Sequence, residues 1–160
     1  MQTKDAIRTV MNSSNHIVSA YLADLSDADL LVRPVPGANT IAWQLGHIIS
    51  SEQRLLSKVP GAQLPELPAG FAEAHGKDRT TAEGPQGFRT KQEYLDLARR
   101  VRAATLAALE KVPDSALDQQ TGIEYAPTVG ALFLMIGNHP LMHAGQFAVV
   151  RRKLGKPIAI

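Results

Sequence analysis

Apolar residues recur at helical spacing in four separate segments of this chain, and this pattern constrains the fold more than any other feature. The segments cover approximately residues 3–24, 40–58, 90–111 and 128–154. We find no internal repeat and no strand-like alternation of any length, so the pattern predicts an all-α chain. Four helices joined by one long crossover indicate a four-helix bundle. The 160 residues, 44% of them apolar, suit a single domain over residues 1–160 with a buried core.

Capping residues place the start of three of these helices. Either Asn39 or Thr40 can cap the second helix, and Thr128 can cap the fourth. Thr90 and Glu93 have the spacing of a capping box, in which each side chain bonds the backbone of the other residue. The third helix is therefore expected to begin directly after Thr90.

Residues 60–89 differ from the rest of the chain because prolines and glycines interrupt them repeatedly. They predict a long crossover between the second and third helices, with one short helical turn near residues 71–75. A loop of this length inside a compact domain is unusual and is often functional. We therefore expect this crossover and the first turn of the second helix to form the walls of a substrate pocket.

Two histidines stand out on the fourth helix. His139 and His143 are four residues apart, so both project from one face, and that face also carries the apolar stripe of the helix. Buried imidazoles need hydrogen bonds or a metal ion. Such a pair is a good chelate, because one helical turn brings both nitrogens to one ion. The spacing alone also fits two core histidines that are hydrogen-bonded to other protein groups. With no cysteine in the chain, any metal must be held by nitrogen and oxygen.

Helical spacing also gives the other polar candidates a position. His47 shares a face with Trp43, Ser50 and Arg54, so periodicity places it at the boundary or surface of the bundle. Gln146 follows His143 by three residues on the inner face, where it can orient a ligand or make a structural hydrogen bond. For the remaining candidates we expect a packing role for Trp43, a solvent or partner surface for His16, and surface positions for Glu52 and His75.

Two short motifs resemble those of a known family. Residues 39–48 read NTIAWQLGHI and are preceded by Arg33 and Pro34, which resembles the second-helix signature of the DinB-like superfamily of metal-binding four-helix bundles. Residues 139–146 read HPLMHAGQ and are followed by RRKLG at 151–155, which is similar to the last-helix signature of that superfamily. Both motifs occur in the expected order, separated by the long crossover and one helix.

The resemblance implies a divalent metal ion held by His47, His139 and His143, in a bundle whose helices run up-down-down-up. Nitrogen ligands suit Zn or Ni best, and Fe, Co or Mn are compatible with them. One feature departs from a regular last helix: Pro140 removes a backbone hydrogen bond and is expected to kink the helix, which can re-aim His139.

Known members of the superfamily include transferases of bacillithiol or mycothiol and a mycothiol-dependent isomerase. The resemblance thus implies a metal-dependent enzyme that transfers a low-molecular-weight thiol to an electrophilic small molecule. A metal-dependent hydrolase and a non-catalytic metal- or ligand-binding stress protein are the alternatives. The chain has no cysteine nucleophile, and Glu52 and Glu124, the nearest candidates for a general base, are not placed beside the histidines by spacing.

Charge and hydropathy limit the partners. The net charge of +2 is small, and no aromatic residues interleave the basic clusters at 99–102 and 151–153, so we expect no nucleic-acid binding. The longest apolar run, 131–136, is far shorter than the ~20 residues that span a bilayer, and the first residues do not resemble a secretory signal. We expect a cytoplasmic protein. The resemblance also suggests a homodimer, to which exposed apolar residues near Phe71, or Ile158 and Ile160, can contribute surface.

Overall fold

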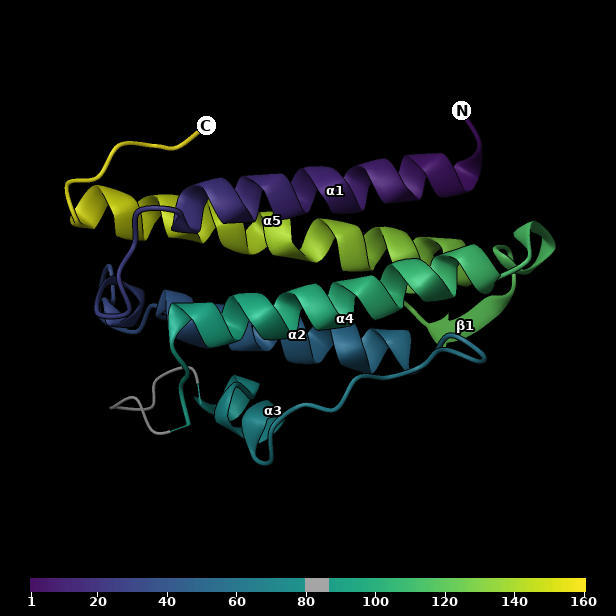
Figure 1. Cartoon of the computed structure of the whole chain (residues 1–160), viewed down its shortest axis with the longest axis horizontal. Helices are drawn as coiled ribbons and strands as arrows, with labels where there is room; N and C mark the ends of the chain where they lie inside the picture. Colours follow the sequence, from purple (N-terminus) through teal and green to yellow (C-terminus); the bar gives the residue numbers. More distant parts are fainter. Residues whose placement is uncertain (80–86) are drawn as a thin grey trace.

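The computed structural model describes residues 1–79 and 87–160, which are mostly helical (Figure 1). None of the described helices is long and apolar enough to cross a membrane. The elements are four long helices, α1 (Thr3–Leu22), α2 (Ile41–Leu56), α4 (Lys91–Lys111) and α5 (Val129–Lys153), a single helical turn, α3 (Phe71–Ala74), three 3-10 turns (Asp29–Leu31, Lys77–Arg79 and Asp114–Ala116), and two strands, β1 (Gln120–Ile123) and β2 (Ala126–Thr128).

The helices begin where the capping residues predicted. Thr40, not Asn39, caps α2, since its side chain accepts a hydrogen bond from the backbone N–H of Trp43. Thr90 and Glu93 form the predicted capping box, with both reciprocal bonds present. The Thr128 hydroxyl accepts the N–H of Ala131 at the start of α5. The predicted turn near residues 71–75 is α3.

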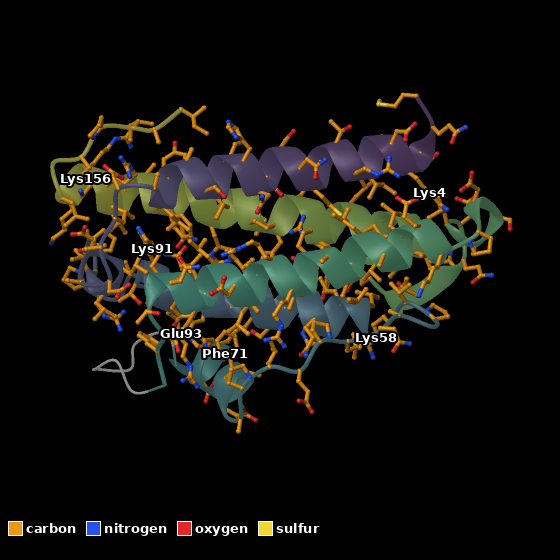
Figure 2. The ribbon with its side chains drawn as sticks, in the orientation of Figure 1. Lys4, Lys58, Phe71, Lys91, Glu93 and Lys156 are labelled. Carbon is orange, nitrogen blue, oxygen red and sulfur yellow. The ribbon has the colours of Figure 1, made fainter. Side chains whose placement is uncertain are left out.

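The four long helices lie side by side, with α5 against α1 and α2 against both α4 and α5 (Figure 1). Gly137 of α5 allows the close approach of α1, because a Cβ atom there would lie 2.9 Å from Cγ1 of Val10. Near the C-terminal end of α1, the Lys91 ammonium at the start of α4 donates to the carbonyl of Leu25, which lies just beyond α1 (Figure 2). Cations at a helix C-terminus satisfy free carbonyls, so this contact ties α4 to α1.

The structure adds one element that the sequence pattern does not indicate. β1 and β2 pair in an antiparallel hairpin, with Gly122 at a positive φ of 73°. Strands of four and three residues are too short to show a convincing alternation of apolar and polar residues. The turn carries Tyr125, whose side chain is exposed.

Two other expectations can be compared with the structure. α5 continues through Pro140 as a single helix. Phe71 itself is buried, with its ring centroid 6.1 Å from that of Tyr94 on α4, so it adds no exposed apolar surface, whereas Ile158 and Ile160 are exposed. Arg151, from the second basic cluster, is buried and forms an ion pair with Asp24.

Candidate metal centre

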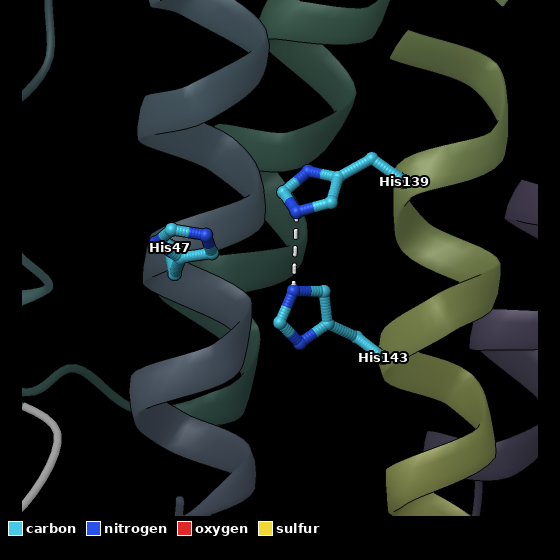
Figure 3. Close-up of side chains that lie close together, drawn as sticks. All are labelled: His47, His139 and His143. Carbon is cyan, nitrogen blue, oxygen red and sulfur yellow. Dashed lines mark hydrogen bonds between the residues drawn. The ribbon is translucent and has the colours of Figure 1, made fainter. Parts of the chain in front are cut away.

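Three histidines from two helices meet between α2 and α5 (Figure 3). One ligand nitrogen from each of His47, His139 and His143 lies within 4.8 Å of the other two. The Nε2 atoms of His139 and His143 are 3.2 Å apart, and the ring of His47 lies 5.3 and 5.4 Å from their rings, centroid to centroid. His143 is buried, while the other two are partly exposed.

Each helix contributes its histidines for a different reason. The four-residue spacing of His139 and His143 stacks both rings on one face of α5, as the sequence predicts. His47 lies on the polar side of α2, but that side faces α5 across the site instead of facing only solvent. The ring of Trp43, one turn earlier, stacks on His47 with centroids 4.8 Å apart and planes 11° from parallel. Trp43 is buried, so its predicted packing role includes fixing the orientation of His47.

A glutamine that the sequence analysis did not single out fixes the tautomer of His143. The amide nitrogen of Gln44 donates to the carbonyl of Asn39, which leaves its Oε1 to accept the Nδ1–H of His143 at 2.9 Å. Nε2 of His143 therefore carries the lone pair and points toward His139. Gln146, which was expected on the inner face, is exposed instead. A sequence signal for Gln44 exists, since it lies between Ile41 and Ile48 on the apolar face of α2.

The electrostatic environment keeps the three histidines neutral. Burial lowers the pKa of His47, that of His139 to about 4 and that of His143 to about 3. The charges of Arg54 and Lys77 lower the pKa values of His47 and His139 further. Neutral imidazole is the form that binds metal ions.

The geometry of the nitrogens fits one ion. Two imidazoles that each bind a metal at ~2.0–2.1 Å place their nitrogens roughly 2.9–3.4 Å apart for angles between octahedral and tetrahedral. The observed 3.2 Å between the Nε2 atoms of His139 and His143 falls in this interval. Nε2 of His143 has no proton to donate, so in the metal-free protein the Nε2–H of His139 donates to it, and a shared cation would take the place of that proton. A ligand nitrogen of His47 lies within 4.8 Å of the other two, so His47 would have to move closer to complete the set.

The crossover packs against the outer side of α2 through a buried histidine, which corrects the expected surface position of His75. Its Nδ1 bonds the carbonyl of Phe71 at 2.7 Å, and its Nε2 bonds the hydroxyl of Tyr94 at 2.8 Å. The carbonyl of Phe71 can only accept, so His75 donates from Nδ1 and its Nε2 accepts the proton of the Tyr94 hydroxyl, whose oxygen also accepts the backbone N–H of Arg89. Burial raises the pKa of Tyr94 to about 12, which keeps that proton in place.

Gly46 is the reason that the crossover can approach so closely. A Cβ atom at this position would lie 2.0 Å from Cδ2 of His75, far inside the contact distance of two carbon atoms. Two further bonds hold the crossover on α2: the indole of Trp43 donates to the carbonyl of Gly76, and the amide of Gln53 donates to that of Pro65. In the second-helix motif, Gly46 therefore makes the close contact with the crossover, and the next residue, His47, belongs to the histidine cluster.

Glu52 does not lie on the surface, as periodicity suggested, and it is not placed to act as a base. Its carboxylate is buried and accepts bonds from the guanidinium of Arg102 and the hydroxyl of Thr105, each at 2.8 Å. Glu124 lies exposed in the turn of the hairpin. His16 is exposed on α1, as predicted. The described residues around the three histidines therefore include no carboxylate ligand or base.

A cavity of about 670 Å³ opens beside His47, between α2 and the crossover. Its lining comes from the middle and end of α2 and from the crossover, together with Tyr125, and no residue of the first turn of α2 is among the described lining residues. The described residues that line it are His47, Ser50, Ser51, Gln53, Arg54, Ser57, Leu64, Ala72, His75, Gly76, Lys77 and Tyr125. A second cavity, of about 330 Å³, has a mainly apolar lining from α1, α2 and α4 together with Pro140 of α5, and none of the three histidines lines it.

The fold and the site together define a class of protein: a helical chain with three neutral histidines clustered between two long helices and an adjacent open cavity. The chain belongs to the DinB superfamily, whose family model matches residues 13–147. The crystal structure of a conserved protein of locus from Enterococcus faecalis has a similar fold, with a TM-score of 0.71 and 16% sequence identity. That alignment covers 98% of this chain and 99% of the other. A search of curated proteins gave no match.

Proposed function

We propose that His47, His139 and His143 bind one divalent metal ion and that the protein is a metal-dependent transferase of a low-molecular-weight thiol. The observation that carries the metal site is the convergence of three neutral imidazoles, with the Nε2 atoms of His139 and His143 3.2 Å apart. Membership of a superfamily that is commonly metal-binding supports the same assignment. Zn or Ni suit three nitrogen ligands best, and Fe, Co or Mn also fit them.

The protein groups around the site have separate tasks. Gln44 holds His143 in the tautomer that presents Nε2, and Trp43 holds the plane of His47. The cavity beside His47 gives a small molecule access from one side, while the apolar core closes the other. A divalent ion at this position would act as a Lewis acid that favours the thiolate form of a neighbouring thiol.

Thiol transfer is favoured over hydrolysis by what the chain itself offers. It contains no cysteine, so a thiol nucleophile has to come from a small molecule. Attack by a metal-bound water is helped by a protein base that takes its proton, and the one buried carboxylate among the described residues, Glu52, is already bonded to Arg102 and Thr105. The alternatives are a metal-dependent hydrolase or a non-catalytic metal- or ligand-binding protein.

The same proposal includes the connectivity of the fold. We take residues 1–160 as one domain in which α1, α2, α4 and α5 form an up-down-down-up bundle. In Figure 1, α2 and α4 run in the same direction and α1 and α5 run in the opposite one. Two parallel neighbours need a long link between them, which is the role of the crossover.

The proposed partners are a small electrophile and a free thiol in the cytoplasm, and a second copy of the chain. Leu134, Met142 and Val149 are all exposed on α5 at positions that return to one helix face. Exposed apolar side chains on one face favour packing against another helix. A homodimer through this face would leave the cavity beside His47 open, since none of the three lines it.

The decisive test measures metal content and then activity. Metal-reconstituted wild type, a chelator-treated sample, and the His143→Ala and His16→Ala variants are assayed with bacillithiol, mycothiol, glutathione and cysteine and a chromogenic electrophile. We expect one ion per chain and a loss of at least ~10²-fold in rate for His143→Ala and for the chelated protein. His16→Ala, an exposed histidine outside the cluster, should match wild type. Equal rates in all preparations would refute the mechanism.

A further inference from the structure

The cavity beside His47 has an unbalanced charge. Arg54, from the last turn of α2, and Lys77, from the crossover, both line it. No aspartate or glutamate is among its described lining residues, and neither cation forms an ion pair within the described part of the chain. Both side chains are exposed to the solvent that fills the cavity.

The two cations line the same cavity as His47 of the histidine cluster. The three histidines are neutral, so they would not offset the double charge of a bound ion. An ion in this place, together with Arg54 and Lys77, would make a strongly positive region that the described protein groups leave unneutralised.

We infer that Arg54 and Lys77 make this cavity selective for substrates that carry a carboxylate or another anionic group, an inference that rests on the proposed function. Guanidinium and ammonium groups form stronger hydrogen bonds to anions than to neutral acceptors. The cavity is also held open in advance, because Gln53 and Trp43 bond the crossover at Pro65 and Gly76. A pre-formed charged wall does not have to be ordered when the substrate binds.

The surroundings of the two cations match a molecule with one charged end. Leu64 and Tyr125 line the same cavity and are 46% and 56% exposed. They come from the crossover and from the hairpin turn, so the cavity combines a cationic wall with apolar surface. A small thiol or electrophile with an anionic group at one end and an apolar part at the other satisfies both.

The test compares 3-mercaptopropionate with its methyl ester, which lacks the negative charge and adds one methyl group. Trp43, the single tryptophan of the chain, stacks on His47, so its fluorescence reports on ligands that enter the cavity. Both thiols are titrated into Zn-loaded and chelator-treated protein. We expect the acid to bind about tenfold more tightly than the ester, and the double variant Arg54→Gln/Lys77→Gln to remove most of this preference. The control double variant Lys111→Gln/Arg152→Gln, which removes the same charge from exposed positions outside the cavity, should keep it.

The outcomes separate this inference from the proposed function. If Zn binds stoichiometrically but the acid-to-ester ratio is the same in both double variants, the selectivity by Arg54 and Lys77 is wrong and the metal site stands. If Zn does not bind, the proposed function fails, and the titration of chelator-treated protein still decides the inference. In that case an acid preference lost only in Arg54→Gln/Lys77→Gln supports it, and an equal affinity for both thiols overturns it.

Discussion

The contact between Gly46 and His75 offers a sharp test of the packing around the site. In Gly46→Ala, the new methyl carbon would fall 2.0 Å from Cδ2 and 2.2 Å from Cγ of the buried His75 ring. Either the ring moves or the crossover does. His75 is held by bonds to the carbonyl of Phe71 and the hydroxyl of Tyr94, so movement of the ring breaks both.

The size of the effect follows from these contacts. Two lost hydrogen bonds cost about 1 kcal/mol each, and the forced repacking adds ~1–3 kcal/mol. Alanine recovers about 1 kcal/mol over glycine in a helix interior. Gly46→Ala should therefore lower the free energy of unfolding by about 2–4 kcal/mol. Gly145→Ala is the matched control, because a Cβ atom there meets nothing within 4 Å, and it should stabilise the protein by up to ~1 kcal/mol.

Urea unfolding of chelator-treated protein measures both variants without a contribution from metal binding. The cause is checked in the His75→Ala background, where the ring is gone and Gly46→Ala should cost nothing. Such a cycle isolates the coupling between the two positions. If Gly46→Ala is as stable as Gly145→Ala, or destabilises equally with and without the His75 ring, the proposed close contact is wrong.

The remaining predictions concern the metal centre and assembly. Chelator should lower the melting temperature of metal-loaded protein, because an ion that binds only the folded chain stabilises it by ~2.7 kcal/mol at 100 times its dissociation constant; a thermal scan without a shift would count against the site. Gln44→Leu should weaken metal affinity about 10–100-fold by releasing His143, measured by competition with a chromophoric chelator. The metal-free protein should lose stability as the pH falls below ~6.5, where histidines of the unfolded chain take up protons. In the folded state His139, with a pKa of about 4, and His143, with a pKa of about 3, do not accept these protons. The urea midpoint should therefore fall more steeply with pH than that of a His139→Asn/His143→Asn variant, and equal slopes would contradict this. Light scattering should give the mass of a dimer that Met142→Glu weakens, and a wild-type monomer at micromolar concentration would remove that proposal.

Local patterns in the sequence were sufficient for the helices. Thr40, Thr90 and Thr128 each cap a helix through a bond to a residue three positions along, so the signal and the structure lie in the same short segment. The hairpin at residues 120–128 has no such signal, because its strands are too short for a period to emerge. β2 leads directly into the start of α5, so the pairing of the two strands depends on the position of that helix and not on a pattern within the strands.

Positions that depend on distant partners could not be predicted in this way. Periodicity predicted a surface position for Glu52, because helical spacing contains no information about Arg102, 50 residues later, with which Glu52 forms a buried ion pair. His75 is buried for a similar reason, since Tyr94 supplies the partner for its Nε2. A buried polar group is stable only with its partner, and helical spacing identifies the group but not the partner.

The polar face of α2 and the length of the crossover explain each other. A helix in a bundle is expected to leave its polar face to solvent, and that expectation placed His47 at the surface. α2 rises about 24 Å over its 16 residues, a span that roughly eight extended residues could retrace to reach a parallel α4. The crossover is several times longer, and described residues of it, among them His75 and Lys77, line the cavity beside His47 and Arg54 of α2. The crossover is longer than a connection between α2 and α4 requires, and this additional length supplies one wall of the cavity beside the three histidines.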